Sequence, residues 1–344
     1  MAQLCYTCAM HILLRITPQR ATQYATMARK LAAPELLASP LGSAIEQVTP
    51  LKLAGQEYLQ MILPEMSPQT IMPVLSRLGA TSEAYEIFER IGDVAGPLLR
   101  PLEPQFQPFV PLEMAEARRY KGKTNEVFTR VLLNLAVFAG AYAREYAGRL
   151  RVLDPLAGGG TTLFLALAMS YDAFGIELAR QDVETTTVFV RQYLSGEHIP
   201  YKEVDERGRK AGRRYQFSIG LKGEQRFLVL VHGDASQAAL HLQEVPGGPH
   251  MHAVVADLPY GIQHFGEISN LLERALPAWE RLLLPGGTLA LAWNATRIER
   301  ASMIELLERC TSLTIRNDTP YTLLEHPVDR VIKRRDVIVG VKDK

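Results

Sequence analysis

From Lys123 onward, short apolar runs alternate with longer segments that have the periodicity of amphipathic helices. The runs are typical of buried strands, and the segments between them are long enough to cross from one strand to the next. This alternation predicts an α/β fold in which helices cover both faces of a mostly parallel sheet of seven strands. The predicted strands cover 151–154, 173–177, 227–231, 252–256, 288–293, 313–317 and 336–341, and the predicted helices include 125–146, 162–170 and 299–310.

The first hundred residues have a different pattern, in which fewer strands and helices follow one another without a strict alternation. Apolar runs predict strands, and a Ser67-Pro68 start followed by Gly79 predicts one of the helices. The sequence therefore predicts a small α+β domain here. Its predicted strands are 6–16, 58–63 and 84–88, and its predicted helices are 18–31 and 67–78.

Prolines separate the two patterns. Five of them lie between Pro97 and Pro111. Proline fixes φ and lacks a backbone donor, so this density predicts an extended linker. The predicted organisation is an α+β domain over 1–96, a linker over 97–112, and the larger α/β domain over 113–344.

Composition excludes some classes of protein and leaves others open. The chain has 344 residues, with 38 basic and 37 acidic side chains, and a balanced total can conceal a basic face. Three cysteines cannot form a disulfide framework, which favours a reducing compartment. Cys5 and Cys8 have no second cysteine or histidine pair, so we expect no metal. The apolar runs fall short of the ~20 residues that span a bilayer, which predicts a cytoplasmic protein without a membrane partner.

A glycine-rich turn joins the first predicted strand of the α/β domain to a helix. Glycines in such a turn let the backbone approach a ligand, and the start of the helix offers free N–H groups. The spacing matches neither GxGxxG nor GxxxxGK[ST], which disfavours a dinucleotide site and a P-loop. The turn reads Asp154-Pro155-Leu156-Ala157-Gly158-Gly159-Gly160-Thr161-Thr162.

Two further acids end the strands that follow. Glu177 stands at the end of the second strand, where a carboxylate can accept from both hydroxyls of a ribose. Asp234, followed by Ala235, ends the third strand and can accept from an adenine amine. Each acid alone could be a helix cap. Three acids at successive strand ends, Asp154, Glu177 and Asp234, favour a ligand that contains a nucleoside.

The segment Asp257-Leu258-Pro259-Tyr260 runs from a strand into a stiff turn. It suits a flat base with an exocyclic amine, because Asp257 can accept one N–H and the Leu258 carbonyl the other. Tyr260 can stack on the base. The alternative is an ordinary strand end followed by a proline turn.

Together these residues resemble the S-adenosylmethionine-dependent amino-methyltransferases of the Rossmann-like class, over about 113–344. The tetrad matches their (D/N)PPY motif except at Leu258, a departure also found in THUMP-associated tRNA guanosine N2-methyltransferases. The resemblance implies S-adenosylmethionine as cofactor, bound by the glycine turn, Glu177, Asp234 and Ala235. It further implies that Lys123 and Thr124 contact the methionine carboxylate, and that catalysis uses neither a metal nor a covalent enzyme intermediate.

The leading hypothesis is methylation of the N2 amine of a guanosine in RNA, with tRNA as the first substrate to test. In this hypothesis, the α+β domain over 1–96 contributes to RNA recognition. Only 84 residues follow Tyr260, which is too few for a carboxyl-terminal recognition domain of the kind found in DNA methyltransferases. The alternatives are a DNA adenine-N6 or cytosine-N4 methyltransferase and an inactive RNA-binding module. The sequence does not determine the oligomeric state.

Basic clusters agree with a nucleic-acid partner, although solvated loops would give the same pattern. The stretch from Lys202 to Arg226 contains 8 basic and 4 acidic residues. The other clusters are Arg118, Arg119, Lys121 and Lys123, and Lys333 to Arg335.

Overall fold

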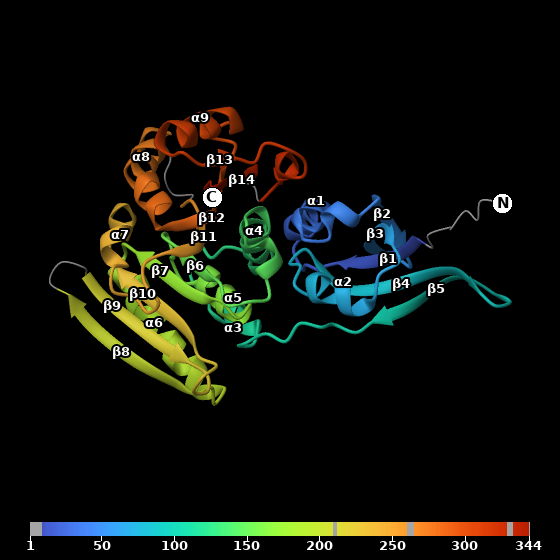
Figure 1. The fold of residues 1–344 in the computed structure, drawn as a ribbon, viewed down its shortest axis with the longest axis horizontal. Helices are drawn as coiled ribbons and strands as arrows, with labels where there is room; N and C mark the ends of the chain where they lie inside the picture. Colours follow the sequence, from blue (N-terminus) through green and yellow to red (C-terminus); the bar gives the residue numbers. More distant parts are fainter. Residues whose placement is uncertain (1–8, 209–211, 260–264, 329–332, 344) are drawn as a thin grey trace.

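The computed structural model describes residues 9–208, 212–259, 265–328 and 333–343, without the side chains of 205–208, 212 and 265. Cys5, Cys8 and Tyr260 therefore lie outside the described residues, as do Arg209, Lys210 and the side chain of Arg207 from the basic stretch. Two sheets carry the fold, one in each part of the chain (Figure 1).

The amino-terminal sheet is antiparallel, with the strand order β2-β3-β1-β4-β5. Alternate residues of β1, from Met10 to Ile16, are buried in the same core as the apolar sides of α1 and α2. The structure confirms the predicted strands and helices of this part and adds β2 and β5. The strands are β1 (Ala9–Ile16), β2 (Gln47–Leu53), β3 (Gln56–Pro64), β4 (Thr81–Ile91) and β5 (Val94–Leu102), and the helices are α1 (Thr22–Ala38), η1 (Gly42–Ala44) and α2 (Pro68–Leu75).

The linker prediction is wrong for residues 97–102, which form the second half of β5. Among the described strands, β5 pairs only with β4, which makes it an edge strand. An edge strand tolerates Pro97 and Pro101, because a missing N–H on its outer side breaks no ladder. Residues 103–112 then lead to the short helix α3 (Glu113–Ala117). The division of the chain into separate domains stays a prediction.

The described residues of the carboxyl-terminal part form a nine-stranded sheet, in the order β13-β14-β12-β11-β6-β7-β10-β9-β8. Its centre, from β12 to β10, is parallel, as the alternation of strands and helices predicted. All seven predicted strands are present, and the hairpin of β8 and β9 raises the count to nine. The strands are β6 (Arg151–Asp154), β7 (Asp172–Glu177), β8 (Tyr201–Gly208), β9 (Gly212–Ile219), β10 (Arg226–His232), β11 (Met251–Asp257), β12 (Leu283–Asn294), β13 (Thr314–Ile315) and β14 (Arg335–Val341).

The extra hairpin lies within the basic stretch that the sequence placed between sheet strands. β9 pairs antiparallel with β10, so the hairpin extends the sheet at one edge instead of interrupting it. In β9 the polar Gln216 and Ser218 alternate with Tyr215, Phe217 and Ile219, which are buried. This period of two is the signature of a half-buried strand.

The predicted helix over 125–146 is shorter in the structure, because α4 (Glu126–Ala139) ends before Gly140. A side chain at Gly140 would lie 2.5 Å from the Gly286 carbonyl oxygen, so only glycine fits against that loop. The predictions over 162–170 and 299–310 are confirmed as α5 and α9. The remaining helices are η2 (Ala143–Glu145), α5 (Thr161–Ala168), α6 (Arg180–Gly196), η3 (Ala235–Gln237), α7 (Ala238–His241), α8 (Phe265–Leu282), α9 (Arg300–Cys310) and η4 (Tyr321–Leu323).

The two parts of the chain meet where α1 packs against α4, beside the larger sheet (Figure 1). The order of the parallel strands reverses between β6 and β11, since the chain leaves β6 toward β7 and β10 and returns to β11 and β12. In doubly wound folds, ligands bind outside the carboxyl ends of the strands at such a reversal. The topology therefore indicates a binding site beside the ends of β6, β7 and β11.

None of the described helices is both long and apolar enough to cross a membrane.

Candidate functional site: a cleft at the strand reversal

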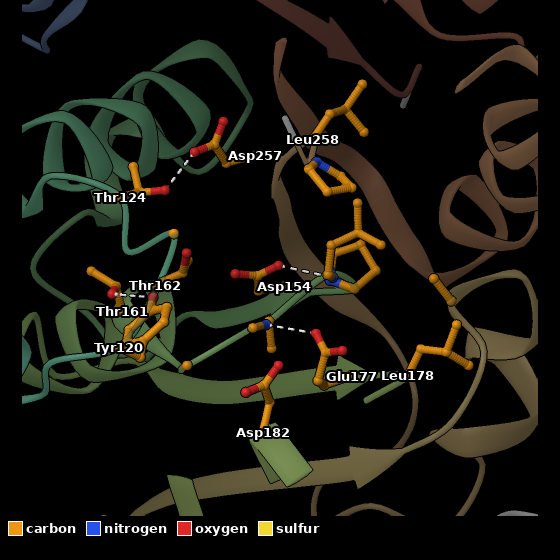
Figure 2. A pocket seen from close by; sticks show the side chains of 18 of the residues that line it. Tyr120, Thr124, Asp154, Thr161, Thr162, Glu177, Leu178, Asp182, Asp257 and Leu258 are labelled. Atoms are coloured by element: carbon orange, nitrogen blue, oxygen red, sulfur yellow. Dashed lines mark hydrogen bonds between the residues drawn. The ribbon is translucent and has the colours of Figure 1, made fainter. Parts of the chain in front are cut away.

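A cleft of about 630 Å³ opens at the carboxyl ends of the parallel strands. Its volume lies within the range of small-molecule and cofactor sites. Figure 2 shows Asp257 with Thr124 at one end, Glu177 with Asp182 at the other, and Asp154 between them. The predicted site residues that line the cleft are Thr124, Asp154, Pro155, Gly158, Gly159, Thr161, Thr162, Glu177, Asp234, Ala235, Asp257, Leu258 and Pro259.

The glycine turn is shaped by hydrogen bonds to the end of the neighbouring strand β7. Ala157 donates its N–H to the Ile176 carbonyl at 2.9 Å, and Gly158 donates to Glu177 Oε2 at 2.8 Å. Gly158 and Gly160 have φ of 49° and 88°, in the left-handed region where glycine carries no steric penalty. The turn is thus fixed against β7, and Gly160 is the N-cap residue that precedes α5.

Tyr120 lies over the middle of this turn. A side chain at Gly159 would lie 2.3 Å from the Tyr120 ring, so the ring fills the space that a Cβ would need. The Tyr120 hydroxyl is 2.8 Å from the Thr161 hydroxyl oxygen, and burial raises the pKa of Tyr120. Tyr120 thereby holds the turn and the first residue of α5 together.

Glu177 is held by backbone donors at both oxygens. Besides the bond from Gly158, Oε1 accepts from the Ala179 N–H at 2.7 Å. Each carboxylate oxygen has a second lone pair, so Glu177 can still accept from a ligand. The next residue, Leu178, also lines the cleft, and 70% of its surface is exposed. An acid beside an exposed aliphatic side chain suits a ligand with hydroxyl groups and a flat apolar ring.

Asp154 is buried at the end of β6. Burial raises its pKa to about 7, although the Thr162 hydroxyl and the Leu156 N–H, the latter at 3.0 Å, stabilise the ionised form. The nearby Asp257 and Glu177 raise the pKa further by repulsion. This grouping of carboxyl groups makes the cleft receptive to a cationic ligand.

Asp234 both lines the cleft and caps η3. Its Oδ1 accepts from the Ser236 N–H at 2.9 Å, and this bond lowers the pKa of Asp234. Asp234 is therefore a helix cap, which the sequence left open as an alternative, and it lines the cleft as well. Ala235 is held in place by Trp279, whose indole N–H donates to the Ala235 carbonyl at 2.9 Å.

Asp257 ends β11 at the far side of the cleft. Its Oδ2 accepts from the Thr124 hydroxyl at 2.7 Å (Figure 2). Leu258 donates its N–H to the Ala292 carbonyl at 2.9 Å, which ties the turn to β12. Asp257, Leu258 and Pro259 therefore project from the sheet edge into the cleft.

Two predicted residues take other positions. Lys123 donates to the Glu116 carbonyl at 3.1 Å and pairs with Glu126, so its ammonium is held outside the cleft lining. Gly160 supports the turn from behind, where a side chain would touch Phe164 and Thr186.

Other residues that line the cleft were not singled out from the sequence. Most of them lie in irregular loops or first helical turns, where a single residue leaves no periodic signal. Tyr120 and Lys121 come shortly before Lys123 and Thr124, to which the resemblance assigned the methionine carboxylate, and this was the available signal for them. The full set is Tyr120, Lys121, Gly122, Thr129, Leu156, Ala157, Leu178, Asp182 and Leu271.

The site has no metal centre among its described residues, since nowhere in the described ranges do three or more His, Cys, Asp or Glu gather in a way that could hold an ion.

No protein-family model and no curated protein matches the chain. Among solved structures, TrmN from Thermus thermophilus is similar over 86% of this chain and 59% of its own, with 17% identity and a TM-score of 0.39. The T. thermophilus 16S rRNA N2 methyltransferase RsmC, solved with AdoMet and guanosine, is similar over 87% of this chain and 59% of its own, with 13% identity and a TM-score of 0.38. A TehB-like SAM-dependent methyltransferase from Corynebacterium glutamicum is similar over 58% of this chain and 84% of its own, with 16% identity and a TM-score of 0.34.

The chain thus spans 59% of the length of each of the two T. thermophilus proteins. Similarities with identities below 25% and TM-scores below 0.5 do not identify the activity of this chain.

Proposed function

We propose that this protein is an S-adenosylmethionine-dependent methyltransferase that acts on the exocyclic N2 amine of a guanosine in RNA, with tRNA as the first candidate. One observation carries the proposal. A single cleft at the strand reversal contains the glycine turn, Glu177 and Asp234 on one side and the Asp257-Leu258-Pro259 segment on the other. A nucleoside cofactor and a flat amine substrate can therefore meet within it.

The residues of the cofactor side fit S-adenosylmethionine. Glu177 offers lone pairs to ribose hydroxyls, and the exposed Leu178 offers an apolar surface to the adenine ring. A Cβ added at Gly158 would have no atom within 4 Å, so the backbone of the turn is open on that side and a ligand can approach it closely. Lys121 is exposed and lines the cleft, and it replaces Lys123 as our candidate for the methionine carboxylate.

The substrate side fits an exocyclic amine. Asp257 can accept one N–H of the amine and the Leu258 carbonyl the other, which orients the nitrogen lone pair. When bound, S-adenosylmethionine supplies an electrophilic methyl group on a sulfonium. The protein's own contribution is to position the amine, to exclude water and to accept a hydrogen bond from the N–H that is lost. Tyr260, which would stack on the base in this proposal, lies outside the described residues.

Guanosine in RNA is favoured over DNA by two features. The Asp-Leu-Pro form of the tetrad resembles that of tRNA guanosine N2-methyltransferases. In addition, the amino-terminal part reaches the substrate side, because the Asn125 side chain, next to Thr124, donates to Gln19 Oε1 at 3.0 Å. An RNA held by the amino-terminal part could therefore extend toward Asp257.

The proposal is tested by incubating the protein with labelled S-adenosylmethionine and either unmodified tRNA, ribosomal RNA or duplex DNA, followed by nucleoside mass spectrometry. We expect N2-methylguanosine in RNA. Methyladenine or methylcytosine found only in DNA would contradict it and favour the DNA alternative.

An Asp257→Asn variant is the matched control for catalysis. It keeps the shape of the side chain and removes the anionic acceptor, so we expect methylation to fall by about 10²-fold or more. Its affinity for S-adenosylmethionine, measured by calorimetry, should stay close to that of the wild type. Cofactor binding without turnover in the wild type would instead support the inactive RNA-binding module.

A further inference from the structure

Arg335 is the first residue of β14, and its side chain extends toward Asp257 at the end of β11. It pairs in the sheet with Asn294 at the end of β12, and β12 lies between β14 and β11. Its side chain is only 4% exposed, and its Nη2 lies 3.9 Å from Asp257 Oδ2. Its inclusion in a solvent-facing basic cluster was therefore wrong, because a buried guanidinium cannot contact a phosphate at the surface.

The guanidinium is held on its other side by an aromatic ring. Arg335 Cζ lies 4.1 Å from the centre of the Phe128 ring, a cation–π distance, and Phe128 is fully buried in the first turn of α4. The Phe128 N–H is capped by Asn125 Oδ1 at 3.1 Å. His326 packs on the same ring, with centres 5.0 Å apart, and exchanges two backbone hydrogen bonds of 2.9 Å with Arg335. Arg335 thus has little freedom to move away from Asp257.

Thr124 contacts the same carboxylate oxygen. Its hydroxyl donates to Asp257 Oδ2 at 2.7 Å, and the cation of Arg335 approaches that oxygen from β14. Two contacts from separate elements on one oxygen fix the rotation of a carboxylate. The sequence assigned Thr124 to the cofactor carboxylate, whereas its hydrogen bond belongs to the substrate side.

We propose that Arg335, held by Phe128, is a positioning residue that works with Thr124 to orient Asp257 toward the substrate amine. This inference rests on the proposed function for its catalytic consequence. Asp257 must present an oxygen lone pair to the amine N–H, and a misplacement of about 1 Å can lower a rate by about 10²-fold. We call the arrangement of Arg335 and Thr124 around Asp257 the clamp. It would keep the Asp257 carboxylate in that orientation before the substrate binds.

The test compares Arg335→Gln, Arg335→Lys and Thr124→Val with an Arg309→Met control. Arg309 lies on α9 outside the cleft lining, is 56% exposed on its side chain, and pairs with Glu273. We expect Arg335→Gln to lower kcat by about 10²-fold while the KM for S-adenosylmethionine stays within about twofold. Arg335→Lys should recover part of the loss, since it keeps the charge but not the planar stack on Phe128. Thr124→Val should lower kcat in the same way, and Arg309→Met should behave as the wild type.

Crystal structures of the same variants test the clamp without any substrate. In Arg335→Gln and Thr124→Val we expect the Asp257 carboxylate to rotate or to occupy several orientations. An Asp257 that keeps its wild-type orientation in both variants, or a kcat that does not change in either, overturns the inference. If the wild type methylates no nucleic acid, the proposed function fails, and the orientation of Asp257 still decides the clamp. Thr124 is only partly buried and near-isosteric with valine, so that arm holds even if Arg335→Gln does not fold.

Discussion

Asp154 is buried at the end of β6, and it also lines the cleft, where a ligand can reach it. Burial raises its pKa to about 7, so a large fraction of the empty protein carries a neutral Asp154 near neutral pH. A ligand with a positive charge favours the ionised form. Binding of S-adenosylmethionine, a sulfonium with an ammonium group, should therefore be linked to the loss of a proton from Asp154.

We predict that S-adenosylmethionine binding releases a proton between pH 6 and 7. The sign follows from the pKa of about 7: below it Asp154 is mostly protonated, and the cationic ligand shifts it toward the carboxylate. The affinity should consequently rise with pH across this window. Titration calorimetry in two buffers of different ionisation enthalpy measures the released proton directly.

Asp154→Asn supplies the control, because asparagine keeps the size of the side chain and cannot ionise. Proton release should be absent in this variant, and its affinity should not change between pH 6 and 7. Equal proton release in both proteins would mean that another group titrates.

The acids at the strand ends were predictable from the sequence, whereas Asp182 in the first turn of α6 and the residues of the loops were not. Asp154, Glu177 and Asp257 each follow an apolar run, and the ends of neighbouring parallel strands must lie at one edge of a sheet. Tyr120 and Lys123 lie in a segment without periodicity. Whether such a side chain turns toward the cleft depends on partners distant in sequence, such as Gly159 for Tyr120, or on local competition, such as Glu126 for Lys123.

At the scale of the element, the start of α4 sets much of the substrate side. Asn125 caps the helix, Thr124 before it contacts Asp257, and Phe128 in its first turn holds Arg335. The sequence predicted where this helix begins, because Asn125 is a preferred capping residue. It did not predict where the helix ends, since the crowding of Gly140 against Gly286 is a tertiary contact.

The sequence did not predict β5, β8 and β9, because prolines or charged residues obscure the alternation of polar and apolar positions in these strands. β5 contains prolines that argue against a strand in the middle of a sheet, although they are acceptable at an edge. β8 and β9 lie in a stretch rich in basic residues, and their pairing with β10 decides their conformation. In each case the position in the sheet, which the sequence does not state, overrides the local preference.

We predict that Asn125→Ala lowers the free energy of unfolding by about 1 kcal/mol, the usual cost of removing a helix cap. The reason is that the Phe128 N–H loses its acceptor, and the bond to Gln19 is lost as well. Urea unfolding followed by circular dichroism measures the change. Asn125→Ser keeps an acceptor for the cap but loses the bond to Gln19, so it should retain most of the stability. Equal losses in the two variants would indicate that the bond to Gln19 matters more than the cap.

At the scale of the whole molecule, a buried polar network joins the amino-terminal part to the larger sheet. Glu35 on α1 is fully buried, and its Oε1 accepts from the Gly79 N–H at 2.8 Å and from Asn134 Nδ2 on α4 at 2.7 Å. Its Oε2 accepts from the Ala80 N–H at 2.9 Å. Arg130 on α4 adds bonds of 2.9 Å to the carbonyls of Arg77 and Ser76, close to the same place.

This network joins α1 and the loop after α2 to α4, so it couples the amino-terminal part to the helix whose start lies beside Thr124 and Asp257. A periodic pattern cannot reveal such a junction, because Glu35 appears in the sequence as one polar residue within an apolar helix. Its three donors come from two segments that are distant from it in the chain.

We predict that Glu35→Ala lowers the free energy of unfolding by about 3 kcal/mol, because it leaves buried donors of Gly79, Ala80 and Asn134 without an acceptor.

Glu35→Gln should lower the free energy of unfolding less than Glu35→Ala, and it should also change how stability depends on pH. Burial raises the pKa of Glu35, so the folded wild type binds more protons than the unfolded chain above pH ~4.3. Its stability therefore decreases as the pH rises from there toward the folded pKa, and glutamine removes this term. The stability of Glu35→Gln relative to the wild type, measured by urea unfolding at successive pH values, should increase with pH. A difference that stays constant with pH would show that the Glu35 carboxyl does not titrate differently in the folded and unfolded states.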